Sequence, residues 1–252
     1  MTTPTAQDGP ADVGSVIEVI PRTLSSVRIA DDGAEEWMSR RYAVESDGYV
    51  RLNMITTITG ATSGEDGTSE TITSRTDRYV LGAVRRAADV VVVGAQTVRA
   101  EGYLLPKSAR LAIVTNSGDL GEDGLRTEGR EGRPPAIVLC PADRADDVRT
   151  ALAGQPVEVR PVDAEGGRLA PRDIVSALQA EGLRRIVCEG GPGLATQFVE
   201  AGVVDEICVT VSPVLEPVRH PFLDLTDRVS STVAGMLVDD AGFSYLRLRV
   251  QE

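Results

Sequence analysis

Six consecutive residues, Glu189-Gly190-Gly191-Pro192-Gly193-Leu194, have the composition of an anion-binding turn. They follow the strand-like run RRIVC, and proline is favoured in the first turn of a helix, so a helix is expected to begin near Pro192. A strand that ends in glycines and enters a helix presents backbone N–H groups and the positive end of the helix dipole, and the missing side chains let a pyrophosphate approach. These six residues fit a dinucleotide site, and by themselves they fit equally a tight turn without a ligand.

A second junction of this kind is Val93-Gly94-Ala95-Gln96-Thr97-Val98-Arg99, where a run of valines ends in glycine. Thr97 could cap the helix that follows or bind a phosphate, and Arg99 could balance the phosphate's charge. A third strand end, Thr115-Asn116-Ser117, offers small polar groups to an adenine or a ribose phosphate, or forms an ordinary turn. Neither G-x-G-x-x-G nor G-x-x-x-x-G-K-[ST] occurs, so the sequence predicts neither a standard Rossmann domain nor a phosphate loop.

The junctions sit in an alternation of strand and helix patterns. Apolar runs typical of strands occur at residues 90–93, 110–115, 135–140 and 184–188. Amphipathic segments between them, including one over residues 76–88, predict crossover helices, and the alternation predicts an α/β fold with a mostly parallel sheet and helices on both faces. Near the chain's end, Asp239-Asp240-Ala241-Gly242 lies between two strand-like runs and predicts an antiparallel hairpin.

The first 48 residues lack this alternation of strand and helix patterns. Residues 1–14 are rich in Thr, Pro, Gly and Asp and predict a disordered leader. Residues 15–22 predict a short strand or a clamp onto the main body, and the stretch around Trp37 has a helical pattern. We therefore expect a partly disordered leader and clamp segment over residues 1–48, followed by one main domain over residues 49–252.

Composition excludes several function classes. A net charge of −12 argues against general nucleic-acid binding, which needs clustered basic residues. The sequence has neither a run of 18 apolar residues nor a signal-peptide pattern, which predicts a cytoplasmic protein that does not bind membranes. The three cysteines lie in apolar runs and predict reduced, buried thiols, and the single histidine, His220, is expected in an exposed loop. We expect no metal site.

Four segments in order resemble the pyrimidine reductase domain of riboflavin biosynthesis, the RibD C-terminal domain family of the dihydrofolate reductase-like superfamily. They are VRLNM with Thr57-Ile58-Thr59-Gly60, Ile72-Thr73-Ser74 with Arg78, VVVGAQTVRAEGY, and IVCEGGPGLATQFVEAGVVDEICVTVSPVL. The resemblance covers about residues 49–250 and makes residues 49–252 a reductase domain. It implies a dihydrofolate reductase-like fold, NADPH as cofactor, a small-molecule substrate and a homodimer.

The resemblance also assigns site residues. Cofactor contacts fall on Gly94, Thr97, Val98, Arg99, Thr115, Asn116, Ser117, Glu189, Gly190, Gly191, Pro192, Gly193 and Leu194. The substrate side falls on Asn53, Met54, Thr57, Thr59, Thr73 and Arg78. In the family, an arginine at the position of Arg78 helps to hold the substrate's ribose phosphate. Without the resemblance, Arg78 would be read as a solvated helix residue.

The chain departs from the family pattern at several positions. The family's strand ends in Ser-x-Asp-Gly, and Thr59 stands here in place of the aspartate. This removes a carboxylate, so we expect the proton to come from water or from a catalytic hydroxyl of Thr57 or Thr59. Further differences lie in Ala100-Glu101-Gly102-Tyr103 and in residues 216–221. The substrate or the activity itself could therefore differ.

The expected function is an NADPH-dependent reductase resembling 5-amino-6-(5-phosphoribosylamino)uracil reductase, in which hydride moves from the nicotinamide to a ribosylamino-pyrimidine. One alternative keeps the fold and cofactor but takes a pterin, as dihydrofolate reductase does. Another is an NADPH-binding protein without turnover, favoured by the missing carboxylate. A third is an α/β domain that binds no dinucleotide. Fold analogy cannot choose among them.

Overall fold

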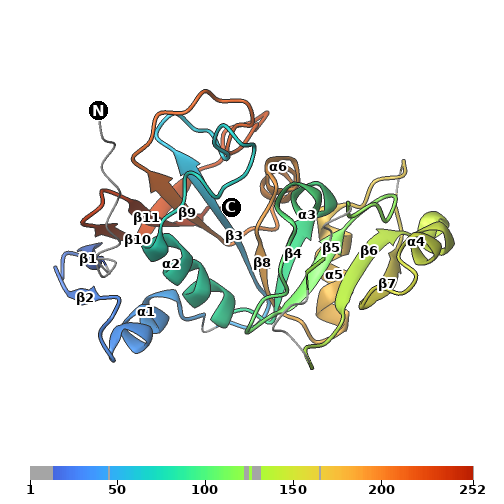
Figure 1. Cartoon of the computed structure of the whole chain (residues 1–252), viewed down its shortest axis with the longest axis horizontal. Coiled ribbons are helices and arrows are strands. Elements are labelled where there is room, and N and C mark those ends of the chain that lie inside the picture. Colours follow the sequence, from blue (N-terminus) through green and yellow to red (C-terminus); the bar gives the residue numbers. More distant parts are fainter. Residues whose placement is uncertain (1–13, 45, 122–124, 127–131, 165, 252) are drawn as a thin grey trace, which may run out of the picture.

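The computed structural model describes residues 14–44, 46–121, 125–126, 132–164 and 166–251. Over these residues the chain forms one eleven-stranded mixed sheet in the order β2-β1-β10-β11-β9-β3-β8-β4-β5-β6-β7 (Figure 1). The strands are β1 (Ser15–Ile20), β2 (Ser26–Arg28), β3 (Tyr49–Thr57), β4 (Val90–Gly94), β5 (Arg110–Val114), β6 (Ala136–Pro141), β7 (Val157–Val162), β8 (Arg185–Cys188), β9 (Glu206–Ser212), β10 (Ser231–Asp239) and β11 (Ser244–Val250). The helices are α1 (Ala34–Tyr42), α2 (Arg75–Arg86), α3 (Ala95–Glu101), α4 (Ala145–Ala151) with a preceding 3-10 turn (Ala142–Arg144), α5 (Pro171–Ala180) and α6 (Pro192–Glu200).

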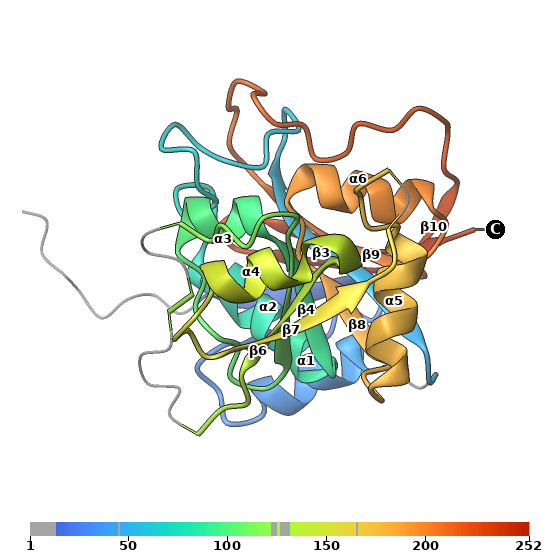
Figure 2. The ribbon, with the colours of Figure 1, turned by 90° about the vertical axis from the view of Figure 1, so that its right-hand side faces the viewer.

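The seven strands from β9 to β7 run parallel, and helices cover both faces of this part of the sheet. Helices α1 to α4 cover one face of the sheet, and α5 and α6 cover the other (Figure 2). Side chains of β4 alternate between the two cores: Val91 and Val93 pack on the first face, and Val90 and Val92 on the second. All four valines are fully buried, as expected of a strand covered on both sides. The predicted α/β class is confirmed.

Helix α2 shows how local sequence sets an element's start. The Ser74 hydroxyl accepts a hydrogen bond from the Asp77 backbone N at 3.0 Å, which caps the first turn. The helix begins at Arg75 and ends at Arg86, so the predicted range of 76–88 is shifted by one residue at its start and two at its end. Such shifts are usual at helix ends, which fray and depend on cap geometry.

The antiparallel half of the sheet closes the fold. β10 and β11 form the predicted hairpin, and the Asp239 carboxylate accepts from the backbone N of Ala241 and Phe243 in its turn. Residues 15–20 are a strand of the same sheet, because β1 pairs with β10. The predicted leader falls, except for Gly14, outside the described residues, and the division at residue 48 stays a prediction.

Three buried cysteines are free thiols, as predicted. Burial raises the pKa of Cys188 and of Cys208 to about 12, which keeps both thiols protonated and unreactive at neutral pH. Among the described residues, no helix is both long enough and apolar enough to cross a membrane.

A buried charge cluster joins the antiparallel half to the parallel half. The Glu206 carboxylate on β9 accepts from Arg51 Nε of β3 at 2.6 Å and from Arg247 Nη2 of β11 at 2.8 Å. Arg51 also donates to the Tyr42 carbonyl at 2.6 Å, at the end of α1. The side chains of Arg51 and Glu206 are 1% and 0% exposed, so water cannot replace a lost partner.

We predict that Glu206→Gln lowers the free energy of unfolding by about 3–5 kcal/mol, because it leaves two arginines without their buried counter-charge. Urea unfolding measures this. Glu36→Gln, which removes an ion pair between side chains that are 65% and 74% exposed, serves as the matched control and should cost less than about 1 kcal/mol. Equal losses of stability in the two variants would contradict the role of Glu206 as a buried counter-charge.

The same cluster predicts a pH dependence. Burial alone would raise the pKa of Glu206, but Arg51 and Arg247 outweigh it, and the pKa lies below its usual value. Its contribution to stability is therefore complete above the unfolded-state pKa and is lost as the pH falls through the lowered folded-state pKa. The free energy of unfolding of the Glu206→Gln variant, measured at acid pH, should lack the part of the wild-type pH dependence that comes from Glu206.

Candidate active site

The two glycine junctions lie side by side at one edge of the sheet. β4 and β8 are parallel neighbours, so their carboxyl ends meet at the same edge. The Gly94 N–H donates to the Gly190 carbonyl at 2.8 Å, and the Glu189 N–H donates to the Val92 carbonyl at 2.8 Å. The two turns that the sequence analysis singled out thus form one structural unit.

Close packing requires glycine at this unit. Gly190 has φ of +82°, and a Cβ there would lie 2.9 Å from the Met54 sulfur. A Cβ on Gly191 would lie 3.0 Å from the Thr97 hydroxyl oxygen. The peptide bond between Gly190 and Gly191 is cis.

Helix α6 starts at this unit without a side-chain cap. Its N-cap residue is Gly191 and its first residue is Pro192. Within the described part of the chain, the N–H groups of Gly191 and Gly193 have no hydrogen-bond partner. Free N–H groups at a helix N-terminus suit a phosphate group, so the unit fits the pyrophosphate of a dinucleotide.

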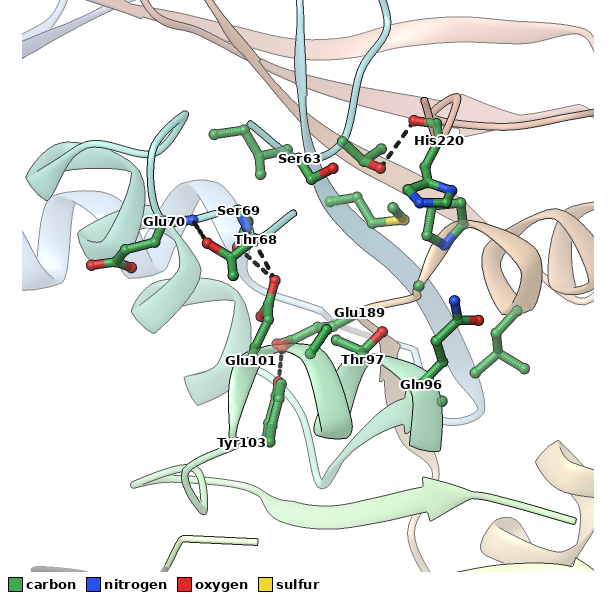
Figure 3. A pocket seen from close by; sticks show the side chains of 18 of the residues that line it. Ser63, Thr68, Ser69, Glu70, Gln96, Thr97, Glu101, Tyr103, Glu189 and His220 are labelled. Atoms are coloured by element: carbon green, nitrogen blue, oxygen red, sulfur yellow. Dashed lines mark hydrogen bonds between the residues drawn. The ribbon is translucent and has the colours of Figure 1, made fainter. Parts of the chain in front are cut away.

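A cleft of about 1130 Å³ opens beside the junctions. It is lined by α3 with the residues that follow it and by the start of α6, and also by β3, the loop over residues 62–73 and α2. Figure 3 shows Gln96 and Thr97 pointing from α3 into the cleft, with His220 reaching in from the opposite side. The cleft therefore lies between the predicted cofactor residues and the predicted substrate residues.

Glu189 lines the cleft and is hydrogen-bonded to neighbouring side chains. Its carboxylate accepts from Arg85 Nε at 2.7 Å and Nη2 at 2.6 Å. The Tyr103 hydroxyl also donates to it (Figure 3). Burial and the nearby Glu189 charge raise the pKa of Tyr103 well above its usual value, so this hydroxyl stays protonated. The positive charge of Arg85 balances the negative charge of Glu189. These contacts connect Glu189 to α2 and to the segment after α3.

The cleft brings together most of the predicted site residues. Those on its walls are Asn53, Met54, Thr73, Arg78, Gly94, Thr97, Glu189, Gly191, Pro192, Gly193 and Leu194. Those that do not line it are Thr57, Thr59, Val98, Arg99, Thr115, Asn116, Ser117 and Gly190. The functional roles of all of these residues stay predictions.

Several residues of the second group have other partners. The Val98 side chain is fully buried in the core beneath α3. Arg99 donates to the Asp119 carbonyl at 2.6 Å, and the Thr115 hydroxyl accepts from the backbone N of Ser117 and Gly118. In this structure Arg99 and Thr115 hold the turn after β5, and none of these three side chains lines the cleft.

Thr57 and Thr59 tie two loops together. Their hydroxyl oxygens lie 2.9 Å apart, and Thr59 donates to the Glu216 carbonyl at 2.5 Å and accepts from the Glu216 N–H at 3.1 Å. Thr57 accepts from the Ala61 N–H at 3.1 Å. Each hydroxyl is therefore engaged in loop contacts away from the cleft wall.

Sequence reasoning missed several polar residues of the cleft, among them Asp77, Arg126, Arg168 and His220. His220 lies in an exposed loop as predicted, but that loop folds over the cleft, where its carbonyl accepts from the Thr62 N–H at 3.2 Å. Burial raises the pKa of Asp77, and hydrogen bonds from Thr73 and Thr210 oppose this rise. The signal for Asp77 was present as an acidic residue three positions after a capping serine.

Comparisons with known proteins show which sequences and folds the chain resembles. The family model described as the RibD C-terminal domain matches residues 48–216, more than half of the chain. The riboflavin biosynthesis protein RibD of Mycobacterium tuberculosis is 30% identical over 191 residues, which cover 75% of this chain and 48% of that protein. The chain spans about half the length of the RibD relatives it matches.

Two further similarities extend the comparison. The 2,5-diamino-6-ribosylamino-4(3H)-pyrimidinone 5′-phosphate reductase of Methanothermobacter thermautotrophicus is 26% identical over 178 residues, which cover 66% of this chain and 78% of that protein. A riboflavin biosynthesis reductase from Saccharomyces cerevisiae superposes with a TM-score of 0.68 at 15% identity, covering 87% of this chain and 100% of that one. At this identity the superposition establishes the fold alone.

We predict that Gly190→Ala lowers affinity for NADPH by about tenfold or more, a loss of about 1.4 kcal/mol, because the added Cβ displaces Met54 or the turn itself. NADPH fluorescence measures the affinity. Gly182→Ala is the matched control, since Gly182 also has a positive φ, +81°, but no atom within 4 Å of the new Cβ. Both changes should destabilise the fold by about 1–2 kcal/mol, and an equal loss of NADPH affinity in both would refute a local role for Gly190.

Proposed function

The chain belongs to the RibD C-terminal domain family, and we propose that it is an NADPH-dependent reductase acting on a 6-(5-phosphoribosylamino)pyrimidine. The observation that carries the proposal is the cleft, in which the glycine junctions of β4 and β8 face the polar wall of β3 and α2. The name of the Methanothermobacter thermautotrophicus relative, a ribosylamino-pyrimidinone phosphate reductase, supports the same reaction and substrate class.

The cofactor fits this chain at the junctions. The N–H groups of Gly191 and Gly193 would hold the pyrophosphate, and Thr97 lies beside them. NADPH, when bound, supplies a hydride from C4 of its nicotinamide to C1′ of the ring-opened ribose imine, whose nitrogen gains the electron pair of the C=N bond and a proton. The protein's task is to align the two reactants and to exclude water.

Arg78 would bind the substrate's phosphate. In this structure its guanidinium pairs with Glu70 at 2.5 Å, and the two side chains are 54% and 71% exposed. An exposed pair of this kind contributes little stability, so a phosphate carrying about two negative charges can compete for the arginine. Arg78 stands at the mouth of the cleft, where a ribose phosphate would remain partly solvated.

We also propose that the protein is a cytoplasmic homodimer. The family resemblance supports both points. Two large apolar side chains on neighbouring loops also support the dimer: Ile58 and Leu215 are 62% and 72% exposed, and the Ile58 N–H donates to the Val214 carbonyl at 3.1 Å. Light scattering of the purified protein at micromolar concentration tests the dimer, and a monomeric mass would refute it.

The proposed activity predicts oxidation of NADPH, followed by its absorbance, when the ribosylamino-pyrimidine phosphate is added. A parallel assay uses dihydrofolate as the substrate. Oxidation with dihydrofolate alone would assign the chain to pterin chemistry, and NADPH binding without oxidation by either compound would favour a non-catalytic NADPH protein. Absence of NADPH binding would overturn the reductase proposal as a whole.

We predict that Arg78→Ala raises KM for the phosphorylated substrate by about 10- to 100-fold, the effect of losing one to two hydrogen bonds to a charged group, and leaves kcat within about threefold. The dephosphorylated nucleoside provides the control, because its KM should not respond to the change. A similar rise in KM for both compounds would argue against a phosphate contact.

We predict that Thr59→Ala leaves kcat within about threefold and lowers the free energy of unfolding by about 1 kcal/mol, because its hydroxyl is committed to Glu216 and the proton is supplied by water. Steady-state kinetics and urea unfolding measure the two effects. A fall in kcat of a hundredfold, with stability and NADPH affinity unchanged, would instead restore the catalytic hydroxyl.

A further inference from the structure

A second cavity borders the antiparallel half of the sheet. It has a volume of about 220 Å³ and lies between β1, the last turn of α1 and the hairpin of β10 and β11. It shares no lining residue with the cleft, and all of its lining residues lie outside residues 48–216, the range that the family model matches. The family match therefore assigns no role to this cavity.

The ionic side chains beside the cavity do not balance in charge. Arg41 of α1 pairs with Glu18 of β1 at 2.9 Å, whereas Arg51 and Arg247 share the single carboxylate of Glu206. Each of these five side chains is at most 20% exposed. Within the described part of the chain, this group of three arginines and two glutamates carries one positive charge in excess.

Arg247 brings the excess charge to the cavity. It lines the cavity, whereas Arg51 and Glu206 do not, and its Nη1 donates to the Arg41 carbonyl at the end of α1. Arg41 lines the cavity as well, and its Nε is a buried donor that has no hydrogen-bond partner among the described residues. A buried charge in excess and an unsatisfied buried donor are both costly, so the pair favours a bound anion.

The remaining wall selects the kind of anion. Ile20 and Pro21 at the end of β1 and Met236 and Leu237 of β10 line the same cavity. A carboxylate matches a guanidinium, because its two oxygens accept from parallel N–H groups, and apolar side chains can pack against its hydrocarbon part. A phosphate group has no apolar part and carries more than one negative charge at neutral pH, so it fits less well. A cavity of this volume is smaller than those that hold drug-sized ligands, so the ligand must be small.

We propose that this cavity binds a small aliphatic monocarboxylate, with the carboxylate at Arg247 and Arg41 and the hydrocarbon part against β10 and the end of β1. The bound acid connects the N-terminal segment to the C-terminal hairpin, since the wall comes from both. This site goes beyond the proposed reductase function and does not depend on it.

Trp37 provides the readout for a test with butyrate. It is the only tryptophan of the chain, and the guanidinium carbon of Arg41 lies 3.3 Å from the centroid of its ring. Titration of the full chain with butyrate should change the tryptophan fluorescence and saturate with a Kd of about 1 mM or tighter. Butyrate should also raise the melting temperature, because it binds the folded state.

Two related compounds separate the contributions of charge and apolar contact. Butyramide, an uncharged analogue of similar shape, should bind at least about tenfold more weakly, since it cannot form a charge-assisted pair with an arginine. Acetate lacks two CH₂ groups and should bind about tenfold more weakly, because it buries less apolar surface.

Variants at the cavity shift the charge in opposite directions. Arg247→Gln removes the excess charge and leaves Arg51 paired with Glu206, so it should weaken butyrate binding by about tenfold or more. Glu18→Gln adds to the excess and should tighten binding by about threefold or more. Arg144→Gln is the control, since Arg144 is 50% exposed next to α4 and its loss should leave the affinity unchanged. Circular dichroism reports whether each variant is folded.

Several results would overturn the proposal. They are the absence of a saturable response to butyrate, an equal response to chloride at the same ionic strength, butyramide binding as tightly as butyrate, and phosphate binding more tightly than butyrate. An unchanged affinity in folded Arg247→Gln or a weaker affinity in folded Glu18→Gln would overturn it as well. The wild-type comparisons and Glu18→Gln decide the question if Arg247→Gln does not fold. None of these measurements uses NADPH oxidation, so a failure here is distinct from a failure of the reductase function.

Discussion

The parallel pairing of β4 with β8 is the constraint on which the site depends. Parallel neighbours deliver their carboxyl ends to one edge of the sheet, and the bond from the Gly94 N–H to the Gly190 carbonyl fixes the two turns against each other. Because Met54 and Thr97 crowd the turns, only glycine fits without a shift at Gly190 and Gly191. The free N–H groups at the start of α6 and the position of the cleft both follow from this packing.

The charged side chains around the cleft differ in how they are paired with other groups. Glu189 is neutralised by Arg85 and Tyr103, and Arg78 is held in an exposed pair with Glu70 that a ligand can displace. Among the described residues, the Asp77 carboxylate has no ion-pair partner and accepts from the hydroxyls of Thr73 and Thr210. Although the chain has a net charge of −12, the free backbone N–H groups at the start of α6 and exposed arginines such as Arg78 supply a local positive potential to the cleft.

Buried polar contacts connect the antiparallel half of the sheet to the parallel half. Glu206 joins three neighbouring strands by accepting from Arg51 and Arg247, and Arg51 reaches on to the carbonyl at the end of α1. Burying charges without partners would be costly, so this cluster specifies the relative register of β3, β9 and β11. Strand β9 also places Thr210 beside Asp77, which connects the strand that carries Glu206 to the wall of the cleft.

The sequence by itself determined the features that are periodic or local. Runs of valine and isoleucine defined the buried strands, the turn at residues 239–242 defined the hairpin, and the glycine-rich junctions defined the two turns where β4 and β8 end. Burial pattern and backbone freedom depend on neighbouring residues, so a local pattern predicts them. Tertiary structure alone decided which polar side chains face the cleft. Thr59 is turned to Glu216, while Asp77 is brought to the cleft by the docking of α2 beside β9 and β10. Side-chain direction at a site depends on packing between segments more than a hundred residues apart, and no local pattern encodes it.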